Sequence, residues 1–182
     1  MSKKAFLSLL PIFALLSSFG YPSEHQGATT LRNPPPVRLE LVDNRPPDAY
    51  DDPLAFRSPY NTRSKIYFGI RAINTSLAPL LLIISDPYLQ DRPELFRAGD
   101  PVPYRKGLED LLKAKEKDPY MRMSQSVTLG ANEGKLIGYI FVKDWFGSLT
   151  AGHYQLTLKH RFELGQDWVE SSSITFEVQP KE

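Results

Sequence analysis

Runs in which apolar and polar residues alternate recur along this chain, and the longest of them follows Gly152. Its apolar or aromatic residues occupy every second position, a period that predicts a β-strand with one buried face and one face in water. One face of this strand carries Tyr154, Leu156, Leu158, His160 and Phe162, and the other carries Gln155, Thr157, Lys159 and Arg161.

Six further runs predict strands, most of them by the same alternation. They cover residues 37–41, 65–74, 80–84, 121–129, 136–142 and 172–178. The run 80–84 is apolar throughout, which is typical of a strand buried on both faces. Residues 130–134 contain two glycines between two of these runs and predict a hairpin loop. About seven short strands with turns between them favour an all-β antiparallel sandwich.

One long segment, 86–120, interrupts this pattern. It contains five prolines, and proline is poorly tolerated inside a sheet, so we expect no regular strand there. Within it, Leu108, Leu111 and Leu112 have helical spacing and predict one short surface helix over 108–116 that packs through the leucines. We interpret 86–120 as an insertion between the third and fourth strands.

The first twenty residues read as a secretory signal. Lys3 and Lys4 precede an apolar run from Ala5 to Leu16, and Ser18 and Gly20 suit a cleavage site. The run is shorter than the roughly 20 residues of a membrane span, so we expect no stable span after signal removal. Residues 21–36 end in three prolines and predict a stiff tether. We expect a secreted or periplasmic protein with its domain in residues 37–180.

Composition narrows the classes of protein further. No cysteine occurs among the 182 residues, which excludes a disulfide framework and an acylated lipoprotein anchor. The formal net charge is +1, and it falls to −1 when Lys3 and Lys4 leave with the signal. A nearly neutral chain has no general electrostatic attraction to nucleic acid.

Residues 149–156 resemble the tyrosine corner of immunoglobulin-like folds, in which a tyrosine near the start of strand F returns its hydroxyl to the backbone upstream. In this resemblance Tyr154 is the corner tyrosine, Gly152 allows the close approach, and Leu156 stands where antibody domains carry a cysteine. The chain departs from antibody domains in lacking both cysteines and the strand C tryptophan.

The chain also resembles bacterial secreted immunoglobulin-like domains of unknown function, over roughly residues 37–178. The matching motifs are N-x-S at Asn74, G-x-Y at Gly152, and the final strand Ser-Ile-Thr-Phe-Glu-Val from Ser173. The resemblance implies a sandwich fold and no activity. It places strands A to G at 37, 65, 80, 121, 136, 153 and 172.

No residue pattern predicts catalysis or a cofactor. A serine nucleophile needs a base and usually a G-x-S-x-G elbow, which is absent. His153 and His160 point to opposite faces of one predicted strand, and His25 lies in the tether, so the histidines predict no zinc site. Acidic residues in the first long loop offer oxygens but match no calcium motif; they are Asp43, Asp48, Asp51 and Asp52. Asn74 is formally an N-glycosylation acceptor.

Aromatic residues in loops are the candidate recognition residues, because exposed Tyr and Trp anchor partners or stack on sugars. They are Tyr88, Tyr104, Tyr120, Trp145 and Trp168. The alternative is that most of them pack loops onto the sandwich. We therefore predict a non-enzymatic binding or structural module that acts through the 86–120 segment on an unknown protein or glycan. The competing hypothesis is a carbohydrate-binding or small-ligand-binding domain.

Overall fold

The computed structural model of this protein describes residues 35–43, 60–62, 65–117 and 124–180. The predicted signal and nearly all of the tether lie outside these ranges, as do Tyr120, Asp48, Asp51 and Asp52. The described residues form mostly antiparallel sheets with three helices. The prediction of an all-β protein is thus confirmed.

The first sheet has three antiparallel strands in the order β1–β3–β8. They are β1 (Val37–Val42), β3 (Tyr67–Asn74) and β8 (Gly134–Phe141). Leu39 lies opposite Ala72 across β1 and β3. Inward positions alternate with exposed ones along β1, as the sequence pattern predicts for a sheet with one wet face.

The second sheet follows the order β2–β11–β9–β5–β6. Its strands are β2 (Tyr60–Asn61), β11 (Ile174–Gln179), β9 (Gly152–His160), β5 (Asp91–Arg97) and β6 (Asp100–Val102). A further short strand, β10 (Val169–Glu170), pairs with β9. Only β2 joins its neighbour in the parallel sense within this sheet of the described chain.

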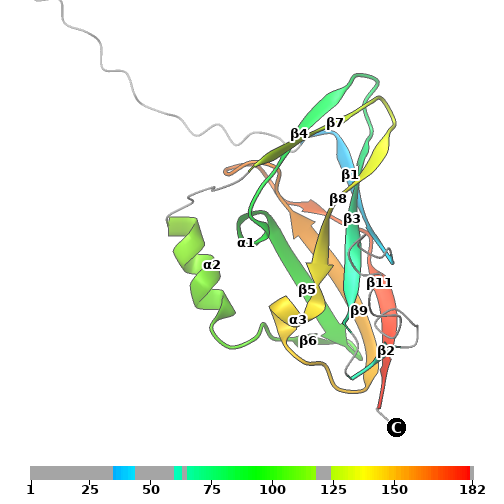
Figure 1. Ribbon diagram of the computed structural model, residues 1–182, viewed down its shortest axis with the longest axis vertical. Coiled ribbons are helices and arrows are strands. Elements are labelled where there is room, and N and C mark those ends of the chain that lie inside the picture. Colours follow the sequence, from blue (N-terminus) through cyan, green and yellow to red (C-terminus); the bar gives the residue numbers. More distant parts are fainter. Residues whose placement is uncertain (1–34, 44–59, 63–64, 118–123, 181–182) are drawn as a thin grey trace, which may run out of the picture.

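The core lies where the inner faces of these two sheets meet (Figure 1). Phe68 of β3 contacts Phe176 of β11 with ring centroids 5.1 Å apart, and Tyr60 meets both rings edge-on. Phe68 is 1% exposed, so its burial stabilises the fold by roughly 1.5–3 kcal/mol. Aromatic residues from both sheets therefore form one shared core.

Strand β5 corrects the prediction that 86–120 is an insertion without regular sheet. It pairs with β9 along its whole length, and Pro93 lies opposite Leu158. The carbonyl of Pro93 accepts a hydrogen bond from the Tyr104 hydroxyl, so this carbonyl points away from β9. The missing N–H lies on that same side, where β6 does not reach, since β6 pairs only with Leu95–Arg97. A proline is tolerated at such an edge-like position.

Strands β4 (Leu80–Ile84) and β7 (Gln125–Leu129) correct two other predictions. They pair with each other in a two-stranded ribbon. Leu81 is 61% exposed and Ile83 36%, so the run 80–84 is not buried on both faces. The loop at 130–134 is not a hairpin loop, because β7 pairs with β4 whereas β8 pairs with β3.

Asn74 secures the junction between this ribbon and the first sheet. Its side-chain amide donates to the carbonyls of Ala78 and Gly130, at 2.7 and 2.9 Å, and its oxygen accepts from the Ser76 N–H. Asn74 is fully buried. A glycan on this nitrogen would break these hydrogen bonds, so the formal acceptor motif is a structural element here.

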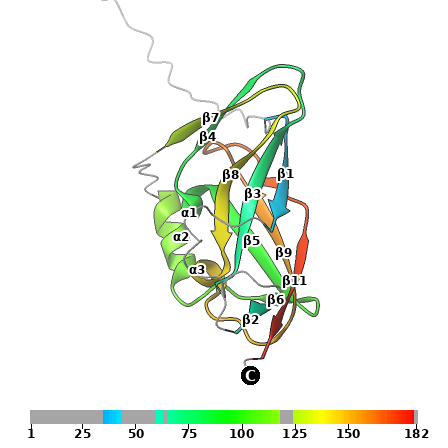
Figure 2. The same ribbon diagram turned by 45° about the vertical axis from the view of Figure 1, so that its right-hand side comes forward.

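The helices are α1 (Pro87–Gln90), α2 (Leu108–Lys117) and α3 (Val142–Phe146). Figure 2 shows them on one side of the molecule, beside β5 and β8. In α2, Leu108 and Leu112 are buried and Leu111 is half-buried, which confirms the predicted helix and its leucine face. None of the helices in the described ranges is both long and apolar enough to span a membrane.

The hydroxyl of Tyr154, near the start of β9, donates to the carbonyl of Thr150 at 2.8 Å. Beside it, Arg97 donates to the carbonyl of Ala151. A Cβ at Gly152 would lie 2.7 Å from Nε of Arg97, so a larger residue here would displace the Arg97 side chain. The close approach that the sequence predicts at Gly152 therefore involves the Arg97 guanidinium.

Candidate functional site

Three of the predicted recognition aromatics pack against one another. Trp145 of α3 lies 5.3 Å from Tyr88 and 5.8 Å from Tyr104, between ring centroids, and Tyr104 also contacts Phe146. Trp145 is only 3% exposed, whereas the two tyrosines are half-buried. This cluster fastens the 86–117 segment to the β8–β9 connection, so it serves packing.

Among the four of these aromatics that the structure describes, Trp168 alone lies outside this cluster. It precedes β10 and is 36% exposed. Its ring lies 4.7 Å from the guanidinium carbon of Arg161 and 5.3 Å from that of Arg92. Guanidinium groups at these distances are attracted to the negative face of an indole ring.

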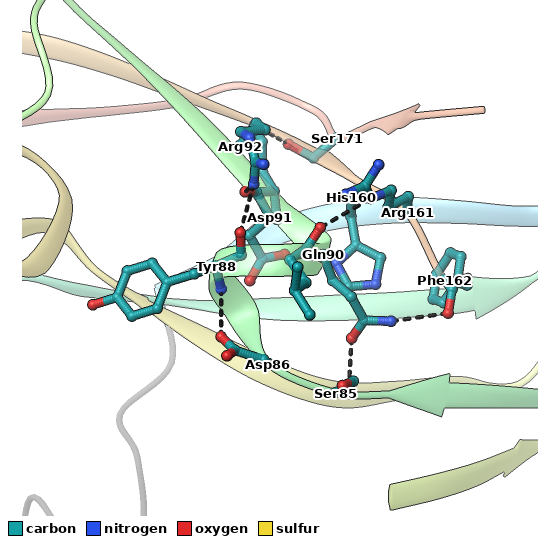
Figure 3. Close-up of polar contacts among 12 residues, drawn as sticks. Ser85, Asp86, Tyr88, Gln90, Asp91, Arg92, His160, Arg161, Phe162 and Ser171 are labelled. Atoms are coloured by element: carbon teal, nitrogen blue, oxygen red, sulfur yellow. Dashed lines mark hydrogen bonds and ion pairs between the residues drawn. The ribbon is translucent and has the colours of Figure 1, made fainter. Parts of the chain in front are cut away.

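The two arginines come from neighbouring strands. Arg92 lies on β5, opposite Lys159, and Arg161 follows directly after β9. The Nη1 group of Arg92 donates to the carbonyls of Tyr88 and Asp91, and Nε of Arg161 donates to that of Leu89. Carbonyls at the end of α1 and the start of β5 thus hold both guanidiniums in place (Figure 3).

Both arginines face one carboxylate on α2. The Nη2 atom of Arg92 lies 2.6 Å from Oε1 of Glu116, and Nη2 of Arg161 lies 3.7 Å from the same oxygen. The arginine side chains are 17% and 14% exposed, but that of Glu116 is 47% exposed. We call Arg92, Glu116, Arg161 and Trp168 the arginine–tryptophan site.

Burial and the neighbouring charges both affect the guanidinium of Arg161. Burial lowers the pKa of its guanidinium, the neighbouring Arg92 charge lowers this pKa further, and Glu116 raises it. An arginine remains charged at any physiological pH. The site therefore holds two fixed cations close together beside a single exposed anion.

Next to Arg92 and Arg161 along the chain lies a buried polar group of Gln90, Asp91 and His160 (Figure 3). Nδ1 of His160 donates to Oδ1 of Asp91 at 2.6 Å. The Gln90 amide nitrogen donates to the carbonyls of Ile83 and Phe162. These bonds tie β4, α1, β5 and the end of β9 together and set the positions of the adjacent arginines.

An Asp–His pair is also part of serine-hydrolase triads. The surroundings of His160 therefore decide whether a serine hydroxyl could act beside it. Nε2 of His160 is buried and has no hydrogen-bond partner among the described residues. The hydroxyl of Ser171 accepts from the Leu158 N–H and donates to the Ser172 carbonyl. The described residues therefore supply no nucleophile next to this imidazole, and we assign the pair a structural role.

No group of three or more residues suited to metal binding occurs within the described ranges. His153 is exposed and His160 buried, on opposite faces of β9. Asp43 accepts a hydrogen bond from the Tyr60 hydroxyl.

Hollows of about 260 to 480 Å³ lie away from the arginine–tryptophan site. One is lined by Val142 and Lys143 of α3, another by His153 and Gln155 of β9, and a third by Pro93 and Phe146. The arginine–tryptophan site itself is therefore distinct from these concavities.

The sequence indicates part of this site. Alternation in β9 places Arg161 on the wet face, and Trp168 was a candidate aromatic residue. Arg92 and Glu116 carry no motif, because their meeting depends on the pairing of β5 with β9 and on where α2 packs.

A scan against protein-family models gives no match for this chain. A search of curated proteins also returns no match.

Proposed function

We propose that this protein is an exported, non-enzymatic binding module built on an immunoglobulin-like sandwich, and that its recognition surface is the arginine–tryptophan site. The observation that carries the proposal is the pairing of two held, partly buried guanidiniums with an exposed indole. Arg and Trp are the residue types that contribute most to binding energy at protein interfaces. The residues of α2 and of the loop before β10 frame this surface.

The strand order supports the immunoglobulin-like part of the proposal. Three strands, β1, β3 and β8, face β11, β9 and β5, in the manner of strands A, B and E against G, F and C. The Tyr154–Thr150 hydrogen bond gives the geometry expected of a tyrosine corner. In this frame strand C is β5, not the run at Leu80, and β4 and β7 form an added ribbon.

The segment that we propose for recognition is shorter than the segment 86–120 that the sequence predicts. Deleting all of 86–120 would remove β5 from the middle of a sheet, so that deletion does not test binding. Apart from α1, the part that lies outside the sheets begins after Val102, where β6 ends, and includes α2. Export by residues 1–20 remains a proposal based on the sequence.

Site-specific photocrosslinking in cells that make the protein tests this proposal. A benzoylphenylalanine at Lys113, an exposed residue one turn before Glu116 on α2, should give a discrete protein adduct. The matched control is the same replacement at Lys135, which is exposed on β8 in the other sheet. Absence of an adduct at Lys113, or equal adducts at both positions, would reject the recognition surface.

The alternative function, carbohydrate binding, keeps only Trp168 as an exposed stacking residue among the four candidates described. Trp145, Tyr88 and Tyr104 contact each other instead of lining a platform. The aromatic packing therefore favours a protein partner over a glycan.

A further inference from the structure

The arginine–tryptophan site has more hydrogen-bond donors than its internal partners use. Each guanidinium carries five N–H donors. Arg92 donates from Nη1 to two carbonyls and from Nη2 to Glu116, whereas Arg161 donates from Nε to Leu89. Within the described residues, Nη2 of Arg161 approaches Glu116 only to 3.7 Å, which is beyond hydrogen-bonding distance. Arg161 thus keeps N–H donors on its terminal nitrogens that these partners do not use.

The ion pair that holds the Glu116 carboxylate on the two arginines is weak. It lies in the last turn of α2 (Leu108–Lys117), where the helix dipole disfavours a negative charge. Its side chain is 47% exposed, and ion pairs of such exposure contribute about 0–1 kcal/mol. A competing carboxylate can therefore displace it at little cost.

Two ion pairs lie next to the site in the sequence of β5, β9 and α2. Lys115 pairs with Asp86, and Lys159 pairs with Glu94. The four residues that define the arginine–tryptophan site thus include two cations and one anion, with Trp168 packed against both guanidiniums. A ligand that brings a carboxylate would neutralise the second cation and use the free donors of Arg161 bidentately.

We propose that Glu116 occupies the place of a carboxylate from an acidic segment of a protein partner, and that binding exchanges one for the other. This inference rests on the proposed function. A glutamate side chain is the group already seated on the two arginines, and the acidic partner would present the same chemistry. Both guanidiniums lie close to the Trp168 ring, which limits its use as a platform for a sugar.

The test is titration of the full chain with a fluorescein-labelled peptide of alternating glutamate and alanine, read by anisotropy at low salt. The wild-type protein should bind it, and a matched peptide with glutamine in place of glutamate should not bind. Glu116→Gln should bind the acidic peptide about fivefold more tightly, since it removes a competitor worth up to about 1 kcal/mol.

Glu109→Gln is the matched control, because it removes the same charge from the first turn of α2, about 10 Å away along the helix. It should change the affinity much less than Glu116→Gln does, because Glu116 is the carboxylate that faces the two arginines. Arg161→Lys keeps the charge but removes the planar fork, so it should weaken binding by several fold. Thermal melts of each variant establish that it is folded before it is titrated.

Equal affinity of wild type and Glu116→Gln would overturn the exchange. Equal binding of the two peptides, or tighter binding of an oligogalacturonate than of the acidic peptide, would overturn the assignment to an acidic protein segment. A crosslinked adduct at Lys113 without any peptide binding would leave the proposed recognition surface in place and reject this inference alone.

Discussion

The buried polar residues of this protein are each held by hydrogen bonds, and each joins elements distant in sequence. Among the described residues they are Asn74, Gln90, Asp91, His160 and Ser171. Asp91 and His160 lie opposite each other on β5 and β9, with side chains 5% and 3% exposed. Their contact is the most buried ion-pair geometry within the described part of the chain.

Asp91→Ala should destabilise the protein by about 3 kcal/mol, because removing one member of a buried pair leaves the other without its partner. Urea unfolding followed by circular dichroism measures this change. Asp100→Ala, an exposed position on β6 of the same sheet, should change stability by less than about 0.5 kcal/mol. Equal effects of the two substitutions would show that the Asp91–His160 contact adds nothing.

One half of this pair is predictable from sequence and the other is not. The alternation in 154–162 places His160 on the inner face, as found. Asp91 precedes Pro93, and a proline-rich segment does not predict a strand. The sequence therefore does not predict that the Asp91 carboxylate contacts the histidine. Only the register Asp91–His160, set by three-dimensional pairing, reveals the contact.

At the scale of elements, two adjacent residues hold the loop between β6 and α2 in place. The Tyr104 hydroxyl donates to the Pro93 carbonyl at 2.9 Å, and the Arg105 N–H donates to the Trp145 carbonyl at 2.8 Å. Burial raises the pKa of the Tyr104 hydroxyl; the charge of Arg92 lowers it, and those of Glu94 and Glu109 raise it. The neutral phenol is therefore the form that the folded protein favours.

Tyr104→Phe should lower stability by about 1 kcal/mol near pH 8, through loss of one hydrogen bond. Because the pKa is raised on folding, this contribution is complete below pH 10.0, the ordinary value, and is lost as pH rises through the folded-state value. The difference between wild type and variant, measured by urea unfolding from pH 8 to 12, should shrink above pH 10. A difference independent of pH would contradict this assignment.

Elements were predictable where local pattern and final environment agree. β1, β3, β9 and β11 alternate because one face meets the core, and α2 forms where three leucines share a face. The apolar content of 80–84 alone does not reveal which face of β4 is covered, and Leu81 is exposed. Such errors arise where partners distant in sequence decide burial.

At the scale of the whole molecule, β1 connects the two sheets. It pairs with β3 along its length, and Leu39 also forms a parallel bridge to Ser171 beside β9. The Ser172 N–H donates to the Leu39 carbonyl, and the Ser171 N–H donates to that of Leu158. The two sheets are therefore joined at this edge by hydrogen bonds as well as by their shared core, in a chain without disulfides.

Ser171→Ala tests how much this joint contributes to the whole fold. The Ser171 hydroxyl accepts from the buried Leu158 N–H at 3.0 Å, and losing it would leave that donor unsatisfied, at a cost of about 1–3 kcal/mol. Both sheets should unfold in one transition at lower urea, because they share the joint. Tryptophan fluorescence and circular dichroism should report the same midpoint.

The matched control is Ser172→Ala, whose exposed side chain leaves the backbone bonds to Leu39 intact; its midpoint should stay at the wild-type value. A midpoint in Ser171→Ala equal to that of the control would show that the core alone holds the sheets together.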